Sequence, residues 1–480
     1  MLFGSRHTLL AVAMLAMLLP ACERADRRLG PVVRLNEVAG DADAHAWPDY
    51  TDIALRDGVV TATWMASGGS RKSDIVVRTS LDGGATWQPE VRPNRPEFAE
   101  TRSLAPQLLR FPESDALLLV WQSRRRLLGQ SFVVARRSED GGRTFGPFHQ
   151  LNSAPKAFAP VAATGGAGEV AVAWPDERRG VRDLLVNRST DGGRTWLPHD
   201  LLVTRNREGN VGESTLVFGP QREAVLAWEE RRSQRSSRAF KPHLLGAHSG
   251  DGATTFSAPE PVEAQYPRKS PLWPRLAASG GRYSLLWGSA VAGSAPQSWL
   301  YLAQSTDGGA TWSAPVEVFS GEEPPFYRML AEGEQLYLVW QGGPRADIGI
   351  WFHASDDGGA TWRGPWSAAQ RLDASPQTEN AFRPALAADG KGAVAVAWVE
   401  AKRRVMLRWS RDFGRTWDAP LTIAAEVEGG GLYHPRLVVG GGRAHVLWER
   451  WPDKSKYVKT LLDVDKPLPR DVFVRTVDLG

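Results

Sequence analysis

The sequence contains a single cysteine in 480 residues, so it can form neither an intrachain disulfide bond nor a cysteine-based zinc site. No apolar run reaches the ~20 residues that a membrane-spanning helix needs, which excludes a polytopic membrane protein. The formal net charge is only +4, which makes nucleic acid a poor partner. The nine histidines are dispersed, and no nucleophile elbow, P-loop or His-Glu-x-x-His motif occurs. We therefore expect no cofactor and no metal ion.

Turn-forming residues and tryptophan are abundant instead. The chain contains 48 glycines, 33 prolines and 20 tryptophans. Glycine and proline favour turns, and tryptophan favours strands, so this composition predicts many short strands. The hydrophobic fraction of 42% and the charged fraction of 23% are typical of a globular protein. A chain of this length holds either several domains or one large repeat array.

The first 21 residues resemble the signal peptide of a bacterial lipoprotein. An apolar run, Leu9–Leu19, ends in Leu19-Pro20-Ala21-Cys22. The resemblance implies cleavage before Cys22, lipid on its sulfur and a place in the cell envelope; Glu23 indicates the outer membrane, facing the periplasm or the cell surface. An ordinary secretory peptide followed by a chance cysteine is the alternative. We therefore divide the chain into a signal peptide (1–21), a lipid-anchored linker (22–29) and a repeat domain (30–480).

One octapeptide recurs seven times, with 50 to 60 residues between copies. The first copy reads Ser80-Leu-Asp82-Gly-Gly84-Ala-Thr86-Trp87. Its aspartates are Asp82, Asp140, Asp191, Asp251, Asp307, Asp357 and Asp412. An aspartate in a tight turn can accept hydrogen bonds from the amides of that turn, and glycine supplies the positive φ angles. We predict that these seven aspartates are structural, not catalytic or calcium-binding.

Eight apolar segments that end in tryptophan repeat in step with the octapeptide. The tryptophans are Trp64, Trp121, Trp174, Trp228, Trp287, Trp340, Trp398 and Trp448. A proline precedes most of them by 13 to 16 residues, at Pro48, Pro106, Pro160, Pro274, Pro384 and Pro435. Each unit thus reads as four strands: one after the proline, one ending in tryptophan, one before the octapeptide and one after it.

Four-stranded units of about 50 residues are typical of propeller blades. We predict an all-β fold, a single β-propeller of eight four-stranded blades, with seven blades as the alternative. The eighth unit has no octapeptide. Its outer strand would come either from the N-terminal segment Gly30–Asn36 or from Asp471–Val477.

The octapeptide resembles the Asp-box, or BNR repeat, of the sialidase superfamily, from about residue 40 to the C-terminus. The resemblance implies a sialidase-like propeller. Enzymes of that superfamily hold the substrate carboxylate with three arginines and use a tyrosine nucleophile with a glutamate partner and an aspartate acid/base. The first arginine usually lies in a Phe/Tyr-Arg-Ile/Leu-Pro motif, but this chain reads Ala46-Trp47-Pro48-Asp49-Tyr50 there. The candidate catalytic residues are therefore taken from weaker matches: Arg268, Arg383, Tyr433 as nucleophile and Glu213 as its activator.

The face opposite the octapeptides is the predicted binding face. Strands alternate in direction, so the loops after the tryptophans and the crossovers between units meet there, and both are rich in arginine and aromatic residues. Guanidinium groups pair bidentately with carboxylate and phosphate. The candidate ligand-binding residues are Trp47, Tyr266, Trp273, Tyr327, Arg328, Phe382 and His434.

These observations predict an envelope lipoprotein that binds anionic glycans or glycolipids without catalysis. Two alternatives stay open. One is a divergent exo-sialidase or another glycoside hydrolase. The other is a scaffold that docks an envelope protein.

Overall fold

The computed structural model describes residues 28–37, 51–67, 72–95, 97, 101–111, 114–125, 128–205, 209–233, 240–262, 271–291, 297–322, 326–373, 380–426, 430–452 and 470–480. The predicted signal peptide (1–21), Cys22, Trp47, Tyr266 and Arg268 lie outside these ranges. Within them, regular structure is strand apart from short 3-10 turns, which include η2 (Gly166–Gly168) and η3 (Trp366–Ala368). The fold is all-β, as predicted. No helix in the described ranges is long and apolar enough to cross a membrane.

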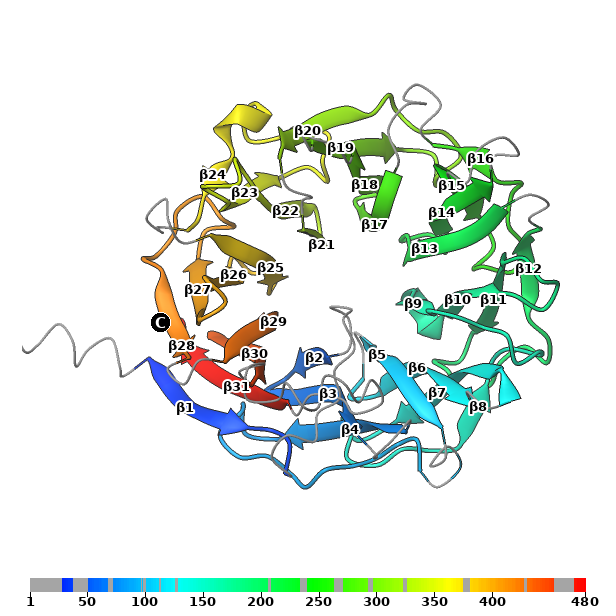
Figure 1. The fold of residues 1–480 in the computed structure, drawn as a ribbon, viewed down its shortest axis with the longest axis horizontal. Coiled ribbons are helices and arrows are strands. Elements are labelled where there is room, and N and C mark those ends of the chain that lie inside the picture. Colours follow the sequence, from blue (N-terminus) through cyan, green and yellow to red (C-terminus); the bar gives the residue numbers. More distant parts are fainter. Residues whose placement is uncertain are drawn as a thin grey trace, which may run out of the picture.

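Five sheets are four-stranded antiparallel meanders of strands consecutive in the chain. They are β9 (Val161–Thr164), β10 (Val170–Asp176), β11 (Asp183–Ser189) and β12 (Leu201–Thr204); β13 (Gly209–Phe218), β14 (Ala224–Ser233), β15 (Phe240–Ser249) and β16 (Glu260–Pro261); β17 (Pro271–Ser279), β18 (Arg282–Val291), β19 (Gln297–Ser305) and β20 (Val316–Gly321); β21 (Tyr327–Glu332), β22 (Gln335–Gly342), β23 (Gly349–Ser355) and β24 (Gln370–Arg371); and β25 (Ala381–Ala388), β26 (Val394–Glu400), β27 (Arg404–Ser410) and β28 (Leu421–Ala425). Figure 1 shows the sheets arranged as a ring around a central opening.

A sixth sheet has seven strands: β2 (Thr51–Arg56), β3 (Val59–Ser67), β4 (Ser73–Ser80), β5 (Arg102–Arg110), β6 (Leu117–Arg125), β7 (Gln130–Ser138) and β8 (Phe148–Gln150). The β4–β5 junction consists of one parallel pair, Ser73 with Arg102, whereas every other junction in this sheet is antiparallel. Two repeat units are therefore joined through a single bridge.

The seventh sheet unites both ends of the chain. Its order is β1 (Leu29–Arg34), β31 (Asp471–Asp478), β30 (Arg443–Trp451) and β29 (Gly431–Gly440). The two closures that the sequence offered as alternatives are both present, because Asp471–Asp478 forms the third strand and the N-terminal segment forms the fourth. In Figure 1, β1 lies along β31 at the outer edge of the ring.

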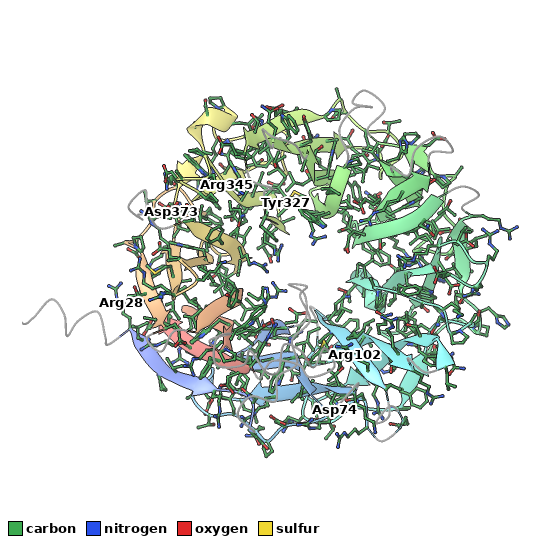
Figure 2. The ribbon with its side chains drawn as sticks, in the orientation of Figure 1. Arg28, Asp74, Arg102, Tyr327, Arg345 and Asp373 are labelled. Atoms are coloured by element: carbon green, nitrogen blue, oxygen red, sulfur yellow. The ribbon has the colours of Figure 1, made fainter. Side chains whose placement is uncertain are left out.

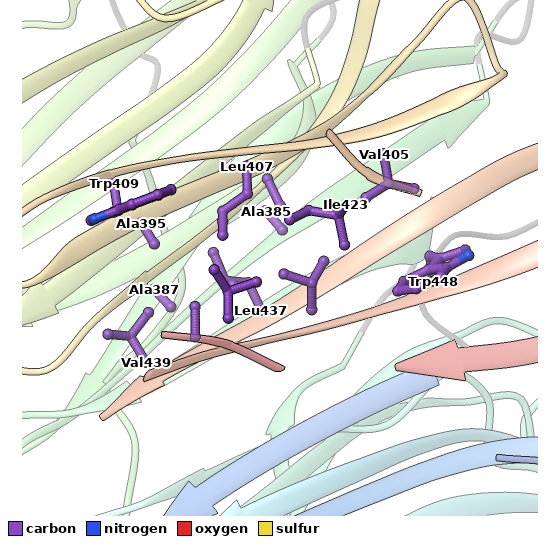
Figure 3. Close-up of a cluster of buried hydrophobic side chains, with 14 of the residues drawn as sticks. Ala385, Ala387, Ala395, Val405, Leu407, Trp409, Ile423, Leu437, Val439 and Trp448 are labelled. Carbon is purple, nitrogen blue, oxygen red and sulfur yellow. The ribbon is translucent and has the colours of Figure 1, made fainter. Parts of the chain in front are cut away.

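The hydrophobic core lies between neighbouring sheets. One cluster joins Ala395 and Leu407 of the β25–β28 sheet to Leu437 and Trp448 of the seventh sheet (Figure 3). All eight repeated tryptophans are buried, each on the second strand of its unit, but these strands continue beyond the tryptophan and do not end at it as predicted. The repeated apolar segments thus supply the surfaces through which adjacent sheets pack.

The seven octapeptide turns share one hydrogen-bond pattern. In the third copy, Asp191 Oδ1 accepts from the Thr195 amide at 2.9 Å, and Oδ2 accepts from the Thr195 hydroxyl at 2.6 Å. Ser189 Oγ donates to Asp191 and accepts from the Gly193 amide. Burial opposes ionisation, but these hydrogen bonds outweigh it and lower the pKa of Asp191 to about 2. The aspartate oxygens are therefore engaged within their own turn.

We expect Asp191→Ala to lower the free energy of unfolding by about 1–3 kcal/mol, because the turn amides lose a charged acceptor. Urea denaturation of the protein starting after Cys22 measures this. Asp115→Ala is the control: its side chain is largely exposed, with Arg56 at 3.8 Å, so we expect a change within about 0.5 kcal/mol. Equal effects of the two substitutions would contradict a structural role for Asp191.

Candidate functional site

An axial cavity of about 560 Å³ lies in the middle of the ring, lined by residues of the innermost strands of every repeat unit. We call the innermost strands β2, β5, β9, β13, β17, β21, β25 and β29. On each of them, one residue pairs with the residue that precedes the buried tryptophan of the next strand. These eight equivalent positions, the channel layer, are Asp52, Gln107, Val161, Thr215, Arg275, Arg328, Ala385 and Arg436.

The channel layer carries three arginines. Arg275 Nη1 donates to the Pro274 carbonyl at 3.0 Å, and Arg328 Nη1 donates to the Tyr327 carbonyl at 2.9 Å. Arg436 Nε donates to the Thr51 carbonyl at 2.9 Å. All three side chains are half-buried and line the cavity. In each of these contacts, one part of the guanidinium is held by a neutral backbone carbonyl.

Two carboxylates also line the cavity, Asp52 and Glu213. Asp52 accepts from the Leu108 amide and from its own neighbour Ile53, both at 2.9 Å. Asp52 therefore bonds backbone amides of both β2 and β5. The cavity therefore has a cationic side, formed by β17, β21 and β29, and a side that is neutral or acidic.

A second layer of residues stands immediately before the prolines of the innermost strands, where several of these strands bulge. Ala105, Ala159, Trp273, Arg383 and His434 all have positive φ, between 31° and 55°, and each precedes a proline. We call these five positions the bulge layer. Positive φ costs a non-glycine residue about 1–3 kcal/mol, and such strain clusters at functional sites. A β-bulge redirects a side chain.

The side chains of the bulge layer differ in size around the ring. It carries alanine on β5 and before β9, but Trp273, Arg383 and His434 on β17, β25 and β29. The large side chains therefore belong to the same part of the ring as the channel-layer arginines.

Aromatic contacts link the bulge layer across three units. The Trp273 and Phe326 rings stack with centroids 6.0 Å apart and 16° between their planes. The Arg383 guanidinium lies 5.0 Å from the Phe326 centroid, and the Arg383 amide donates to Gln341 Oε1 at 2.9 Å. The surface is planar and aromatic with a cation beside it, which suits a sugar ring bearing an acidic group.

Tyr327 fixes the backbone of the Trp273 bulge. Its hydroxyl donates to the Trp273 carbonyl at 2.5 Å and accepts from the Gly288 amide at 2.8 Å. Burial raises the pKa of this phenol above its ordinary value. In Figure 2, Tyr327 lies on the inner side of the ring, whereas Arg28 lies at its outer edge. Tyr327 is therefore a neutral support for the Trp273 bulge.

His434 is held by a buried carboxylate. Its Nδ1 lies 3.2 Å from Glu449 Oε2, which also accepts from Trp451 Nε1 at 3.1 Å and from Arg470 Nη1 at 3.2 Å. Burial opposes ionisation of Glu449, but hydrogen bonding and charge interaction with His434 and the charge of Arg470 lower its pKa. His434 is only 3% exposed, and its Nε2 has no hydrogen-bond partner.

A second buried carboxyl lies behind Glu213. Glu229 is fully buried on β14, and its Oε2 accepts from Arg231 Nη2 at 2.9 Å. Burial raises the pKa of Glu229, and the charge of Glu213 raises it further. A carboxyl with a raised pKa next to an ionisable partner is a candidate proton donor.

Most arginines of the outer loops are neutralised. Arg179 pairs with Asp183 at 2.6 Å, Arg404 with Glu400 at 3.0 Å and Arg450 with Glu426 at 2.6 Å. Arg178 lies between Asp176 and Asp200, 2.7 Å from each. These four arginines are therefore each paired with a carboxylate at the outer surface.

The BNR repeat-like domain family matches residues 58–322, more than half of the chain. The chain belongs to this family. No curated protein matches its sequence. A solved PL25 polysaccharide lyase, an ulvan lyase bound to -[GlcA(1-4)Rha3S]-, is 10% identical, with 81% of this chain and 97% of that chain covered and a TM-score of 0.54. This likeness shows the propeller fold.

Two further solved structures are more distant. A Hadza microbial sialidase is 16% identical over 68% of this chain and 70% of that chain, with a TM-score of 0.38. An α-L-arabinanase from Penicillium chrysogenum is 17% identical over 65% of this chain and 94% of that chain, with a TM-score of 0.42.

In this BNR propeller, several residues selected from sequence lie around the axial cavity. Glu213 and Arg328 line it, while Trp273, Arg383 and His434 occupy the bulge layer above Tyr327. Phe382 is half-buried on β25, beside Arg383. The described ranges contain no group of three or more His, Cys, Asp or Glu side chains arranged to hold a metal ion.

The structure does not bring Tyr433 and Glu213 together. Tyr433 is on β29 and stacks on Trp451, with centroids 4.3 Å apart. Glu213 is on β13, on the opposite side of the ring (Figure 1). A tyrosine nucleophile activated by that glutamate therefore has no geometric basis here.

Sequence reasoning missed Arg275 and Asp52. The available signal was positional, because Arg275 and Arg436 each follow the proline of their unit, at Pro274 and Pro435. The residue after that proline faces the axis in one unit after another.

Proposed function

We propose that this BNR protein is a lipid-anchored envelope protein whose eight-bladed propeller binds an anionic glycan in its axial cavity. Arg275, Arg328 and Arg436 would hold the carboxylate or sulfate of the sugar. The observation that carries the proposal is the convergence of these three arginines at one level of a cavity of about 560 Å³.

Burial inside the ring makes these arginines effective. A guanidinium forms charge-assisted, often bidentate hydrogen bonds with carboxylate, phosphate and sulfate-like groups. The partly enclosed cavity lowers the local dielectric constant and strengthens such contacts relative to the outer surface. The Trp273–Phe326 stack would accept the apolar face of a sugar ring. The ulvan lyase that shares the fold was solved with a glucuronate and sulfated rhamnose chain, the same class of ligand.

The count of eight blades rests on the channel layer, where eight innermost strands contribute one equivalent residue each. The bridge between Ser73 and Arg102 then joins two separate blades. Lipid attachment at Cys22 rests on the sequence pattern, and mass spectrometry of the mature N-terminal peptide tests it.

A binding panel tests the glycan proposal. The soluble protein starting after Cys22 is titrated calorimetrically with trigalacturonate, with a sulfated oligosaccharide and with a neutral trisaccharide of equal length. We expect binding of the charged sugars, weakened by salt, and none of the neutral one. Equal affinity for charged and neutral sugars, or no binding, would contradict the proposal. Capture of an envelope protein without glycan binding would favour the scaffold function.

A carbohydrate-cleaving enzyme is the second candidate, favoured by Glu213 at the cavity and Glu229 behind it. Fluorogenic uronides and sialosides, incubated with the same protein, test this. Turnover that is lost in Glu229→Gln would support an enzyme, whereas binding without turnover supports a lectin-like role.

A further inference from the structure

We propose that His434 takes up a proton when an anion binds beside Arg383 and Arg436, so that the affinity of the site rises as the pH falls. This inference rests on the proposed anion site. It adds that ligand binding is coupled to the protonation of one side chain, His434.

The Glu449 contact fixes where the protons of His434 lie. The carboxylate of Glu449 can only accept, so Nδ1 carries a proton toward it across the 3.2 Å contact. Trp451 and Arg470 donate to the same oxygen and keep it in place. The second ring nitrogen, Nε2, is buried without a hydrogen-bond partner. Protonation at Nε2 is therefore the only titration available to this ring.

The charges around His434 come from three strands and from Arg470, which precedes β31 and donates to Glu449 Oε2 at 3.2 Å. Arg436 follows two residues later on β29, Arg383 belongs to the neighbouring strand β25, and Glu449 belongs to β30. Tyr433, the preceding residue on β29, has its ring centroid 6.1 Å away. Burial lowers the pKa of His434, Glu449 raises it in part, and the positive charges of Arg383 and Arg436 lower it again. In the free site, burial and the two neighbouring cations therefore disfavour protonation of His434.

An anion held at Arg436 in the proposed site opposes the effect of both cations. Its negative charge cancels their field at the imidazole, and the protonated ring is then stabilised both by the ligand and by Glu449. The pKa of His434 is thus higher in the complex than in the free protein. Affinity must rise as the pH falls through the bound-state pKa and must level off below the free-state pKa.

The backbone keeps the ring in this position. His434 has φ of 50° before Pro435, and histidine is among the few residues enriched in this conformation. The equivalent positions on β5 and before β9 are Ala105 and Ala159, which cannot titrate. Proton uptake coupled to anion binding is therefore expected at the β29 side of the cavity and not at the β5 or β9 side.

Calorimetry of trigalacturonate binding tests the inference, because galacturonate stays ionised throughout the range used. Titrations at pH 5.5, 6.5 and 7.5, each in two buffers of different ionisation enthalpy, count the protons taken up. We expect net uptake and a Kd that falls about three- to tenfold between pH 7.5 and 5.5, since one unit of pKa shift corresponds to a factor of ten. His434→Gln, which keeps the size and polarity of the side chain, should bind without this uptake.

His445→Gln is the matched control, because His445 is also a buried histidine of β30 but contacts the Thr476 hydroxyl at 3.0 Å and does not line the cavity. It should keep the proton uptake. Uptake that persists in His434→Gln, or none in the unmodified protein, would overturn the inference while leaving the anion site intact. No binding at any pH would remove the anion site as well. If His434→Gln fails to fold, NMR titration of labelled histidine in the unmodified protein decides: no histidine pKa that rises with trigalacturonate would overturn the inference.

Discussion

Arg275→Ala is expected to weaken binding of trigalacturonate at least tenfold, and Arg275→Ala combined with Arg328→Ala is expected to abolish measurable binding. A hydrogen bond to a charged group contributes about 1.5–3 kcal/mol, which corresponds to roughly a ten- to hundredfold change in Kd. Arg275 lines the cavity, and among the described residues its guanidinium is tethered through Nη1 to the Pro274 carbonyl. Its remaining donors are therefore available to a ligand. Calorimetric titration at fixed salt concentration measures the loss.

The matched control is Arg179→Ala. Arg179 carries the same charge but lies in an outer loop, where it pairs with Asp183. We expect its removal to change Kd by less than about twofold, because exposed and already paired charges contribute little. An equal loss in both variants would mean that long-range charge, not the cavity, drives binding. Arg275→Lys adds a further distinction: lysine restores the charge but not the bidentate geometry, so recovery should be partial.

The fold could be predicted because its signals are local and repeated. Each repeated tryptophan and each octapeptide reports on its own unit, and the eight tryptophans and seven octapeptides confirm one another. Trp64 and Trp448, at opposite ends of the chain, are buried in the same way. The closing sheet was harder to predict. We expected either the N-terminal segment or Asp471–Val477 to complete it, whereas both do.

The candidate site was only partly predictable, since it depends on relations between blades. The importance of Arg275 and Arg436, which follow prolines, appears only when the register places them at one level with Arg328, which follows Tyr327. The loop arginines looked equally promising in sequence, yet Arg179 and Arg450 are neutralised by acids that lie 4 and 24 residues away in the chain. Residue type alone does not distinguish a paired arginine from one that faces a cavity.

Removal of β1 should have the largest effect on stability. A protein that begins at residue 38 lacks Leu35, which is fully buried against Val472 and Val474, and the backbone bond from Leu35 to the Val472 carbonyl at 2.7 Å. It also lacks Asn36, whose side chain bonds Asp471 and the Val472 amide, both at 2.9 Å. Loss of a buried leucine costs about 2–5 kcal/mol, and each lost hydrogen bond adds about 1 kcal/mol.

We therefore expect the protein that begins at residue 38 to lose at least about 5 kcal/mol of unfolding free energy in urea denaturation, or to aggregate. A protein that begins at Arg28 is the control and should keep full stability, because the Asp478 amide bonds the Arg28 carbonyl and β1 is complete. A synthetic peptide of residues 28–37, added in trans, should restore part of the loss by pairing with the exposed edge of β31. If the shorter protein were as stable as the control, the N-terminal strand would not close the ring. The last sheet would then hold together through β29, β30 and β31 alone.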